Sequence, residues 1–365
     1  MGKSSYSFTS SSLKADSFFW KKSPHELSHL RQLSDLVICH VHDDTISSFR
    51  DAIANNTNTL RRLSLPPNLC ARLPVRLFDN LTHLHMNMDY APYPTDAELD
   101  FNFALRHTTR LESLSLPMHP EREVVASLYD NGNALTNLVS LQLRFHYQQL
   151  PPPDEDRLLY FLRERRRLRR LYLQFEESSN PVYCRKLFLL FNELPNLQVL
   201  GLNPCYLTLP DTIGELQCSL ADFLPPRLKA FHAKLPDQAP FSDHNLTLVT
   251  MLSFECLRDG LIIVKLRGFK RSHHLTYLDL ILANLDRHLP FKPAEFTADN
   301  LQLQLLGLDD AMYDVQAGVP VAKWPAWKRI LALPEDFEDE DHWWLHSISQ
   351  AWRWTEISLP TEYYS

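Results

Sequence analysis

The residues with the clearest potential for chemistry lie near the N-terminus, where His25, Glu26 and His29 form an H-E-x-x-H motif. On a helix, two imidazoles four residues apart lie on one face and can bind zinc, while the glutamate activates a water molecule. Pro24 directly precedes the motif, and no further G-x-x-H ligand follows it.

The residues around this motif favour a structural role. Leu27, Leu30 and Leu33 have the spacing of a buried helical stripe, which is typical of an N-terminal cap. We therefore expect no catalytic residue, no cofactor and no bound metal. A zinc-dependent hydrolase that uses His25 and His29 is the alternative.

Other histidines and cysteines could also be metal ligands. They are Cys39, His40, His42, His83, His85, His273 and His274. No group among them supplies four ligands at the spacings that zinc prefers, so we expect surface or half-buried side chains.

A basic run follows in the middle of the chain. It comprises Arg163, Arg165, Arg166, Arg167, Arg169 and Arg170. Leucines at 162 and 168 interrupt it, so the pattern indicates the solvated convex face of a helix, with contact to an acidic partner as the alternative.

Composition excludes several classes of protein. The 365 residues include only 8 Gly, and none are clustered as the P-loop, G-x-G-x-x-G or G-x-S-x-G motifs require. The net charge of −7 argues against a nucleic-acid partner, since such proteins normally carry a basic field.

Cysteine spacing and hydropathy bear on the compartment. The six cysteines occur singly, as expected for reduced thiols in an intracellular protein. No stretch has the length of a membrane span or the apolar region of a secretory signal, so we expect a cytoplasmic or nuclear protein, or one present in both compartments, without membrane contact.

The elements that position these residues come from a repeat, L-x-x-L-x-L. Its copies begin at Leu33, Leu60, Leu81, Leu111, Leu138, Leu168, Leu197, Leu228, Leu261, Leu275, Leu303 and Trp354. The central copies are 21 to 31 residues apart, close to the period of about 20–29 residues of leucine-rich repeats.

Each copy predicts one coil of a solenoid. The fourth and sixth positions alternate as in a strand, and most copies follow a helix-like run that has its own apolar residues. Stacked coils would bury these apolar faces, with a parallel sheet on the concave side of a horseshoe-like α/β solenoid and helices on the convex side.

The array resembles leucine-rich-repeat proteins, in particular the irregular repeats of fungal F-box/leucine-rich-repeat proteins. That resemblance implies a substrate-recognition scaffold of a ubiquitin ligase, with a Skp-type adaptor or a cullin component as partner. It covers the repeats, whereas only Pro24, Glu26 and Leu27 match an F-box. The Asn or Cys that usually follows the strand occurs here only as Asn68 and Cys205.

We predict three regions. Residues 1–23 form a disordered Ser-rich tail, 24–310 the solenoid with its N-terminal cap, and 311–365 an acidic C-terminal cap that includes a last repeat strand beginning at Trp354. Six of the seven Trp fall in this last region, where large aromatics can cover the apolar end of a solenoid. A lid or binding insertion is the alternative, because Trp is also a favoured interface residue.

Residues between the core leucines would face the concave wall, so we expect a protein partner, of a kind the sequence does not specify, to bind there. The candidate binding residues are Arg144, Arg170, Tyr172, Gln174, Asn203, His232 and Lys234. Their mixture of Arg, Tyr and His is typical of interfaces, although an ordinary solvated sheet face explains the pattern equally well. The sequence thus predicts a non-catalytic protein-protein interaction module.

Overall fold

A computed structural model gives the arrangement of the repeats. The structure describes residues 12–15, 31–38, 46–65, 73–86, 101–118, 121–145, 152–175, 181–204, 224–235, 249–256, 274–282, 294, 297, 301–308, 311–325, 328, 334–337 and 339–356. The chain divides into two units, residues 1–168 and 169–365.

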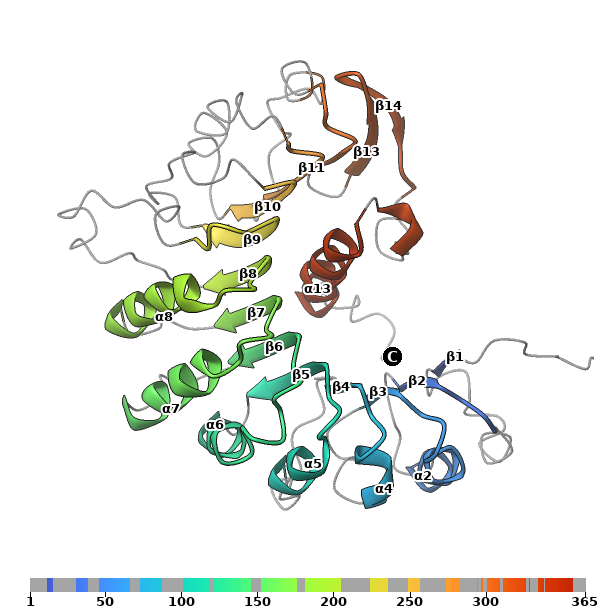
Figure 1. Ribbon diagram of the computed structural model, residues 1–365. Coiled ribbons are helices and arrows are strands. Elements are labelled where there is room, and N and C mark those ends of the chain that lie inside the picture. The colour runs from blue at the N-terminus through green and yellow to red at the C-terminus, as the bar shows by residue number, and fades with distance from the viewer. Residues whose placement is uncertain are drawn as a thin grey trace, which may run out of the picture. The chain divides into compact units, whose positions relative to one another are not determined.

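Unit 1 consists of parallel strands alternating with helices. In chain order its elements are β1 (Ser12–Ala15), β2 (Asp35–Ile38), α2 (Ile46–Asn55), β3 (Arg62–Leu65), α4 (Val75–Phe78), β4 (His83–Met86), α5 (Phe101–His107), β5 (Ser113–Met118), α6 (Glu121–Asp130), β6 (Ser140–Phe145) and α7 (Pro152–Arg163). Each strand pairs in parallel with the next, and the helices lie on one face of the sheet (Figure 1).

Unit 2 continues the same pattern and then changes. Its elements are β7 (Arg170–Phe175), α8 (Pro181–Glu193), β8 (Val199–Pro204), β9 (Ala230–Leu235), β10 (Met251–Cys256), β11 (Tyr277–Leu282), β12 (Leu305–Leu308), β13 (Ala311–Gln316), β14 (Val319–Lys323), the 3-10 turn η5 (Pro334–Asp336) and α13 (Glu340–Glu356). Strands β7 to β12 are parallel, whereas β13 and β14 are added antiparallel.

The repeat leucines form the core between sheet and helices. Paired strands place Leu36, Leu63 and Leu84 side by side, and each is at most 2% exposed. Helices contribute the facing residues, such as Phe49 of α2 and Phe78 of α4, which are fully buried. This regular burial confirms the predicted α/β leucine-rich-repeat solenoid.

At several coil junctions, polar side chains that precede a strand bond to the backbone of the preceding coil. Asn56 Oδ1 accepts from the Leu33 amide at 2.9 Å, and Asn137 Nδ2 donates to the Thr109 carbonyl at 3.0 Å. Arg165 is buried and donates to the carbonyl of Gly132 in the previous coil. Through these bonds, side chains that precede the strands satisfy backbone groups at the coil junctions. Asn68 and Cys205, the two residues that match the usual Asn or Cys after a repeat strand, lie outside the described residues.

Three predictions about elements need correction. Residues 12–15, within the expected disordered tail, form β1 and pair with β2. The strand between β9 and β11 is β10, which the L-x-x-L-x-L pattern does not predict, while the predicted copy at 261–266 lies outside the described residues. The predicted last strand is wrong at its start, because Trp354 lies in α13, which extends to Glu356.

Candidate functional site

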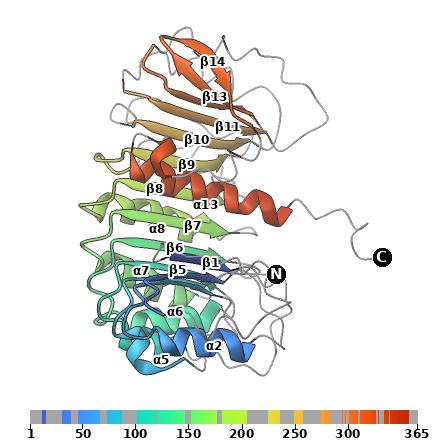
Figure 2. The ribbon, with the colours of Figure 1, turned by 90° about the vertical axis from the view of Figure 1, so that its right-hand side faces the viewer.

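In unit 2 the sheet face opposite the leucine core is lined by two cross-strand rows. One row contains Arg170, Val199, Ala230, Met251, Tyr277 and Leu305, and the other contains Tyr172, Gly201, His232, Ser253, Asp279 and Gly307. We call these rows the α13-contacting face, because α13 packs on them and Figure 2 shows it over β8 and β9. The first row is apolar apart from Arg170 and the Tyr277 hydroxyl.

Two glycines give this face its shape. A Cβ at Gly201 would lie 2.1 Å from Tyr172 Cδ2, so the tyrosine ring lies across β8 where a side chain would otherwise stand. The ring stacks on His232 with centroids 5.9 Å apart, and His232 Nδ1 lies 2.9 Å from Ser253 Oγ. Gly307 makes room for Asp279 in the same way, since its Cβ would lie 2.0 Å from Asp279 Oδ1.

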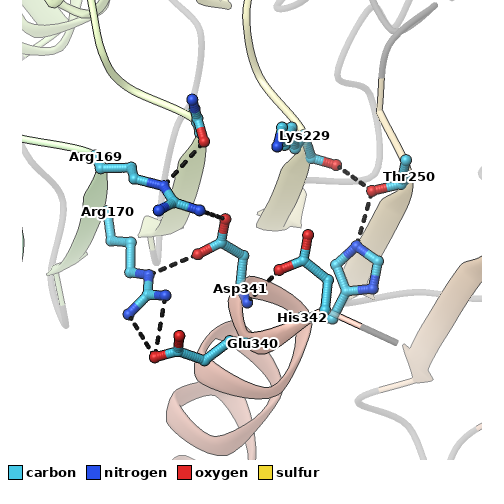
Figure 3. Close-up of polar contacts among 9 residues, drawn as sticks. Arg169, Arg170, Lys229, Thr250, Glu340, Asp341 and His342 are labelled. Carbon is cyan, nitrogen blue, oxygen red and sulfur yellow. Dashed lines mark hydrogen bonds and ion pairs between the residues drawn. The ribbon is translucent and has the colours of Figure 1, made fainter. Parts of the chain in front are cut away.

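Helix α13 binds this face through charged groups in its first turn. Asp341 is fully buried and accepts from Arg169 Nη2 and from Arg170 Nε, both at 2.7 Å (Figure 3). Arg170 also pairs with Glu340 at 3.3 Å. A carboxylate in the first turn also interacts favourably with the positive end of the helix dipole. Asp341 is therefore stabilised both by the two arginines and by the dipole of its own helix.

Further along α13, two histidines bond to the sheet. His342 Nε2 lies 2.8 Å from the Thr250 hydroxyl, which also donates to the Lys229 carbonyl (Figure 3). His346 Nδ1 lies 2.7 Å from the Tyr277 hydroxyl.

Apolar side chains fill the space around these polar contacts. Leu345 and Ile348 of α13 are buried against Tyr172, Val199, Ala230, Met251 and Tyr277, while Trp343 and Trp344 pack at the margin. This contact therefore combines aromatic, aliphatic and ion-paired groups.

Most of the predicted binding residues in unit 2 are thus enclosed. Tyr172, Gln174 and His232 are each at most 2% exposed, and the Arg170 side chain is 13% exposed in its ion pairs with α13. They lie on the sheet face opposite the leucine core, which α13 covers, and their role in binding a partner stays a prediction. Asn203 and Lys234 lie in β8 and β9, but their side chains are outside the described residues.

The corresponding face of unit 1 is polar. Its rows are Asp35, Arg62, His83, Ser113 and Ser140, then Val37, Ser64, His85, Ser115 and Gln142. We call these rows the polar face; side chains on β2 to β4 are half-buried or exposed, and those on β6 are buried. Arg62, with its side chain 65% exposed, pairs with Asp35 at 3.5 Å.

Arg144 lies on β6 beside the polar face, two residues after Gln142, and is largely buried. The Gln142 amide bridges two groups: its nitrogen can donate to Ser115 Oγ at 2.9 Å, and its oxygen can accept from Arg144 Nε at 3.1 Å. Loss of water around the imidazole, and secondarily the Arg144 charge, lower the pKa of His85 to about 3. His85 is therefore neutral at physiological pH.

The basic run does not form one solvated face, contrary to our interpretation. Arg165 is buried, which lowers its pKa, and Arg167 donates to Asn137 Oδ1 at 2.6 Å. Arg169 and Arg170 bind α13, while Arg163 and Arg166 are exposed. The run therefore serves several separate contacts.

Most of the histidines and cysteines considered as candidate metal ligands lie outside the described residues. They are His25, His29, Cys39, His40, His42 and His273. His83 and His85 lie two residues apart on β4 and share the polar face. Among the residues that the structure describes, no three His, Cys, Asp or Glu side chains are grouped as a metal site would require. None of the described helices combines the length and the hydropathy needed to cross a membrane.

Comparisons with known proteins add little to this description. No protein-family model matches this chain, and no curated protein sequence does. Among solved structures, a chain described as "Crystal structure of TLR13-ssRNA13 complex" is 15% identical with a TM-score of 0.34, and the match covers 76% of this chain. This chain spans only 42% of the length of that one. The solenoid fold is itself typical of protein-interaction modules, whereas the absence of a nucleic-acid partner stays a prediction.

Proposed function

We propose that this protein is a non-catalytic interaction module that binds a protein partner on the polar face of unit 1. The observation that carries the proposal is the contrast between the two sheet faces. The α13-contacting face of unit 2 has one largely apolar row and is covered by α13, whereas β2 to β4 present polar, partly exposed side chains in register.

The chemistry of the polar face favours a partner rich in carboxylates and backbone carbonyls. Arg62 is cationic and exposed, His83 and the serines supply further donors, and the largely buried Arg144 adds positive charge beside the rows. Asp35 is the acidic residue in the two rows, and Arg62 already pairs with it. A face with excess donors steers acidic surfaces toward it and discriminates against basic ones.

Affinity purification of the tagged chain from its source cell tests this proposal. The variant Arg62→Glu/His83→Asp reverses the charge of the polar face, and we expect it to recover at least about tenfold less partner, the effect of losing ~1.4 kcal/mol. The matched control is Arg106→Glu/His107→Asp on α5, in the helical layer, which should leave recovery unchanged. Equal recovery by both variants would contradict the proposal.

The resemblance of the repeats supports a narrower role, as a substrate-recognition scaffold of a ubiquitin ligase. The same purification, analysed by mass spectrometry, should then recover a Skp-type adaptor or a cullin. Purifications that repeatedly recover the partner without either protein would leave a stand-alone interaction module.

Two further expectations complete the proposal. Elemental analysis of the purified protein should find no stoichiometric zinc; zinc that is lost on His25→Ala would instead support the hydrolase alternative. We also propose that the protein resides in the cytoplasm, the nucleus or both, which fluorescence microscopy of the tagged chain tests.

A further inference from the structure

The contact between α13 and the sheet differs in kind from the rest of the core. Elsewhere the coils are joined mainly by leucines and backbone pairing, with a few side-chain bonds to the backbone, whereas α13 is held by Arg–carboxylate pairs, histidines and aromatic side chains as well as by Leu345 and Ile348. Arg and aromatic residues are the groups enriched at protein-protein interfaces. The contact therefore resembles a bound helix more than a folded core.

Helix α13 is also complete without the sheet. Its N-terminus is capped within the same segment, where Asp339 Oδ1 accepts from the Asp341 amide at 2.8 Å and the Asp339 carbonyl accepts from the amides of His342 and Trp343. Strands β7 to β12 pair with one another in turn, so the sheet is equally complete. Among the residues that the structure describes, detachment of α13 would break side-chain contacts but no backbone pairing with the sheet.

The contacts define what such a face recognises. Asp341, His342, Leu345, His346 and Ile348 meet the sheet, which is the i, i+1, i+4, i+5, i+7 stripe of an amphipathic helix. The ligand needs a carboxylate in its first turn to meet the two arginines, followed by an aliphatic residue one turn later to enter the apolar row. A helix in a groove is a common mode of peptide recognition.

We propose that the α13-contacting face is a helix-binding surface, which α13 occupies within the same chain and from which a partner protein's amphipathic helix of this pattern displaces it. This inference concerns unit 2 and does not depend on the polar face of unit 1. It assigns to the Trp-rich C-terminal helix the role of a built-in competitor.

A synthetic peptide of residues 339–356 tests the surface in the full-length protein. In the wild type, α13 competes at an effective concentration of about millimolar, so added peptide should bind weakly. The variant Asp341→Arg places a cation against Arg169 and Arg170 and should release α13. Fluorescence anisotropy should then show the labelled peptide binding to this variant at least ~10-fold more tightly than to the wild type.

Two controls match the charge change. Glu335→Arg, at an exposed position in η5, should leave peptide binding at the wild-type level. A peptide carrying Asp341→Arg should not bind the released face. An Asp341→Arg protein that keeps its circular dichroism spectrum but binds no more wild-type peptide than the wild type does would overturn the proposal.

Hydrogen exchange on the wild type decides the matter even if Asp341→Arg fails to fold. We expect the amides of α13 to exchange through an opening that leaves the amides of β8 and β9 protected. Exchange of α13 only together with β8 and β9 would make the helix a permanent part of the core and refute its role as a displaceable ligand.

Discussion

Replacing Gly201 by alanine tests the geometry of the α13-contacting face most directly. The added Cβ would lie 2.1 Å from Tyr172 Cδ2 and 2.6 Å from Cε2, whereas ordinary contact begins near 3.4 Å. The ring must therefore move by more than 1 Å. It is confined by the stacked His232 and by Leu345 of α13, whose Cδ1 lies 3.1 Å from the new Cβ.

The change in unfolding free energy caused by Gly201→Ala should differ in sign between the wild type and a Tyr172→Ala protein. Overpacking costs typically 1–3 kcal/mol, and because the ring is confined we expect Gly201→Ala to destabilise unit 2 by about 2–3 kcal/mol. Tyr172→Ala alone should cost about 3–5 kcal/mol. Once the ring is gone, Gly201→Ala should instead stabilise the strand by about 0.5–1 kcal/mol, because alanine loses less backbone entropy than glycine on folding.

Urea unfolding followed by tryptophan fluorescence measures this cycle. Six of the seven tryptophans lie between residues 324 and 354, so the signal reports on unit 2 even if unit 1 unfolds separately. The expected coupling free energy between the two positions is about 3 kcal/mol. Equal costs of Gly201→Ala in both backgrounds would refute the placement of the Tyr172 ring over β8.

Three further outcomes are expected. The pKa of His85 is lowered from 6.5 to about 3 in the folded chain, so the unfolded chain binds an extra proton between these values and stability falls as the pH drops through this range. Between pH 7 and pH 5 the free energy of unfolding of His85→Gln should therefore fall by up to about 2 kcal/mol less than that of the wild type, as measured by urea unfolding followed by circular dichroism. The same pH dependence in both proteins would show that the folded chain also binds this proton. Arg165→Met removes one of the two donors to the buried Gly132 carbonyl, the other being the Leu135 amide, and should cost about 1–2 kcal/mol by the same measurement, whereas a cost below about 0.5 kcal/mol would show that this link is dispensable. Asp339→Ala removes the N-cap of α13 and should cost about 1 kcal/mol by tryptophan fluorescence, and no change would contradict the cap.

The coils could be predicted because a single spacing fixes both strand and core. Leu63 and Leu65 are two residues apart on a strand and therefore lie on the same face of the sheet. That face is buried, since both side chains are at most 2% exposed. The coil that contains β10 departs from the leucine pattern and was therefore not predicted. Val249, Leu252 and Phe254 occupy the repeat positions of β10, but only one of them is leucine.

The covering of the sheet in unit 2 could not be predicted from the repeat, since a strand pattern states which side a residue faces and not what lies over it. A signal was nevertheless present. The strand position held by Arg62 and His83 in unit 1 becomes Val199, Ala230 and Met251 in unit 2. Apolar residues on both faces of a strand indicate burial on both faces, which calls for a second covering layer.

The long separation between α13 and its face has a consequence for synthesis. Arg170 precedes Asp341 by 171 residues, so the row from Val199 to Leu305 emerges from the ribosome before its cover exists. At ~5–20 residues per second, roughly three to ten seconds separate Leu305 from the end of α13. During that interval an apolar sheet surface is exposed, and such a surface is open both to aggregation with other chains and to binding by chaperones.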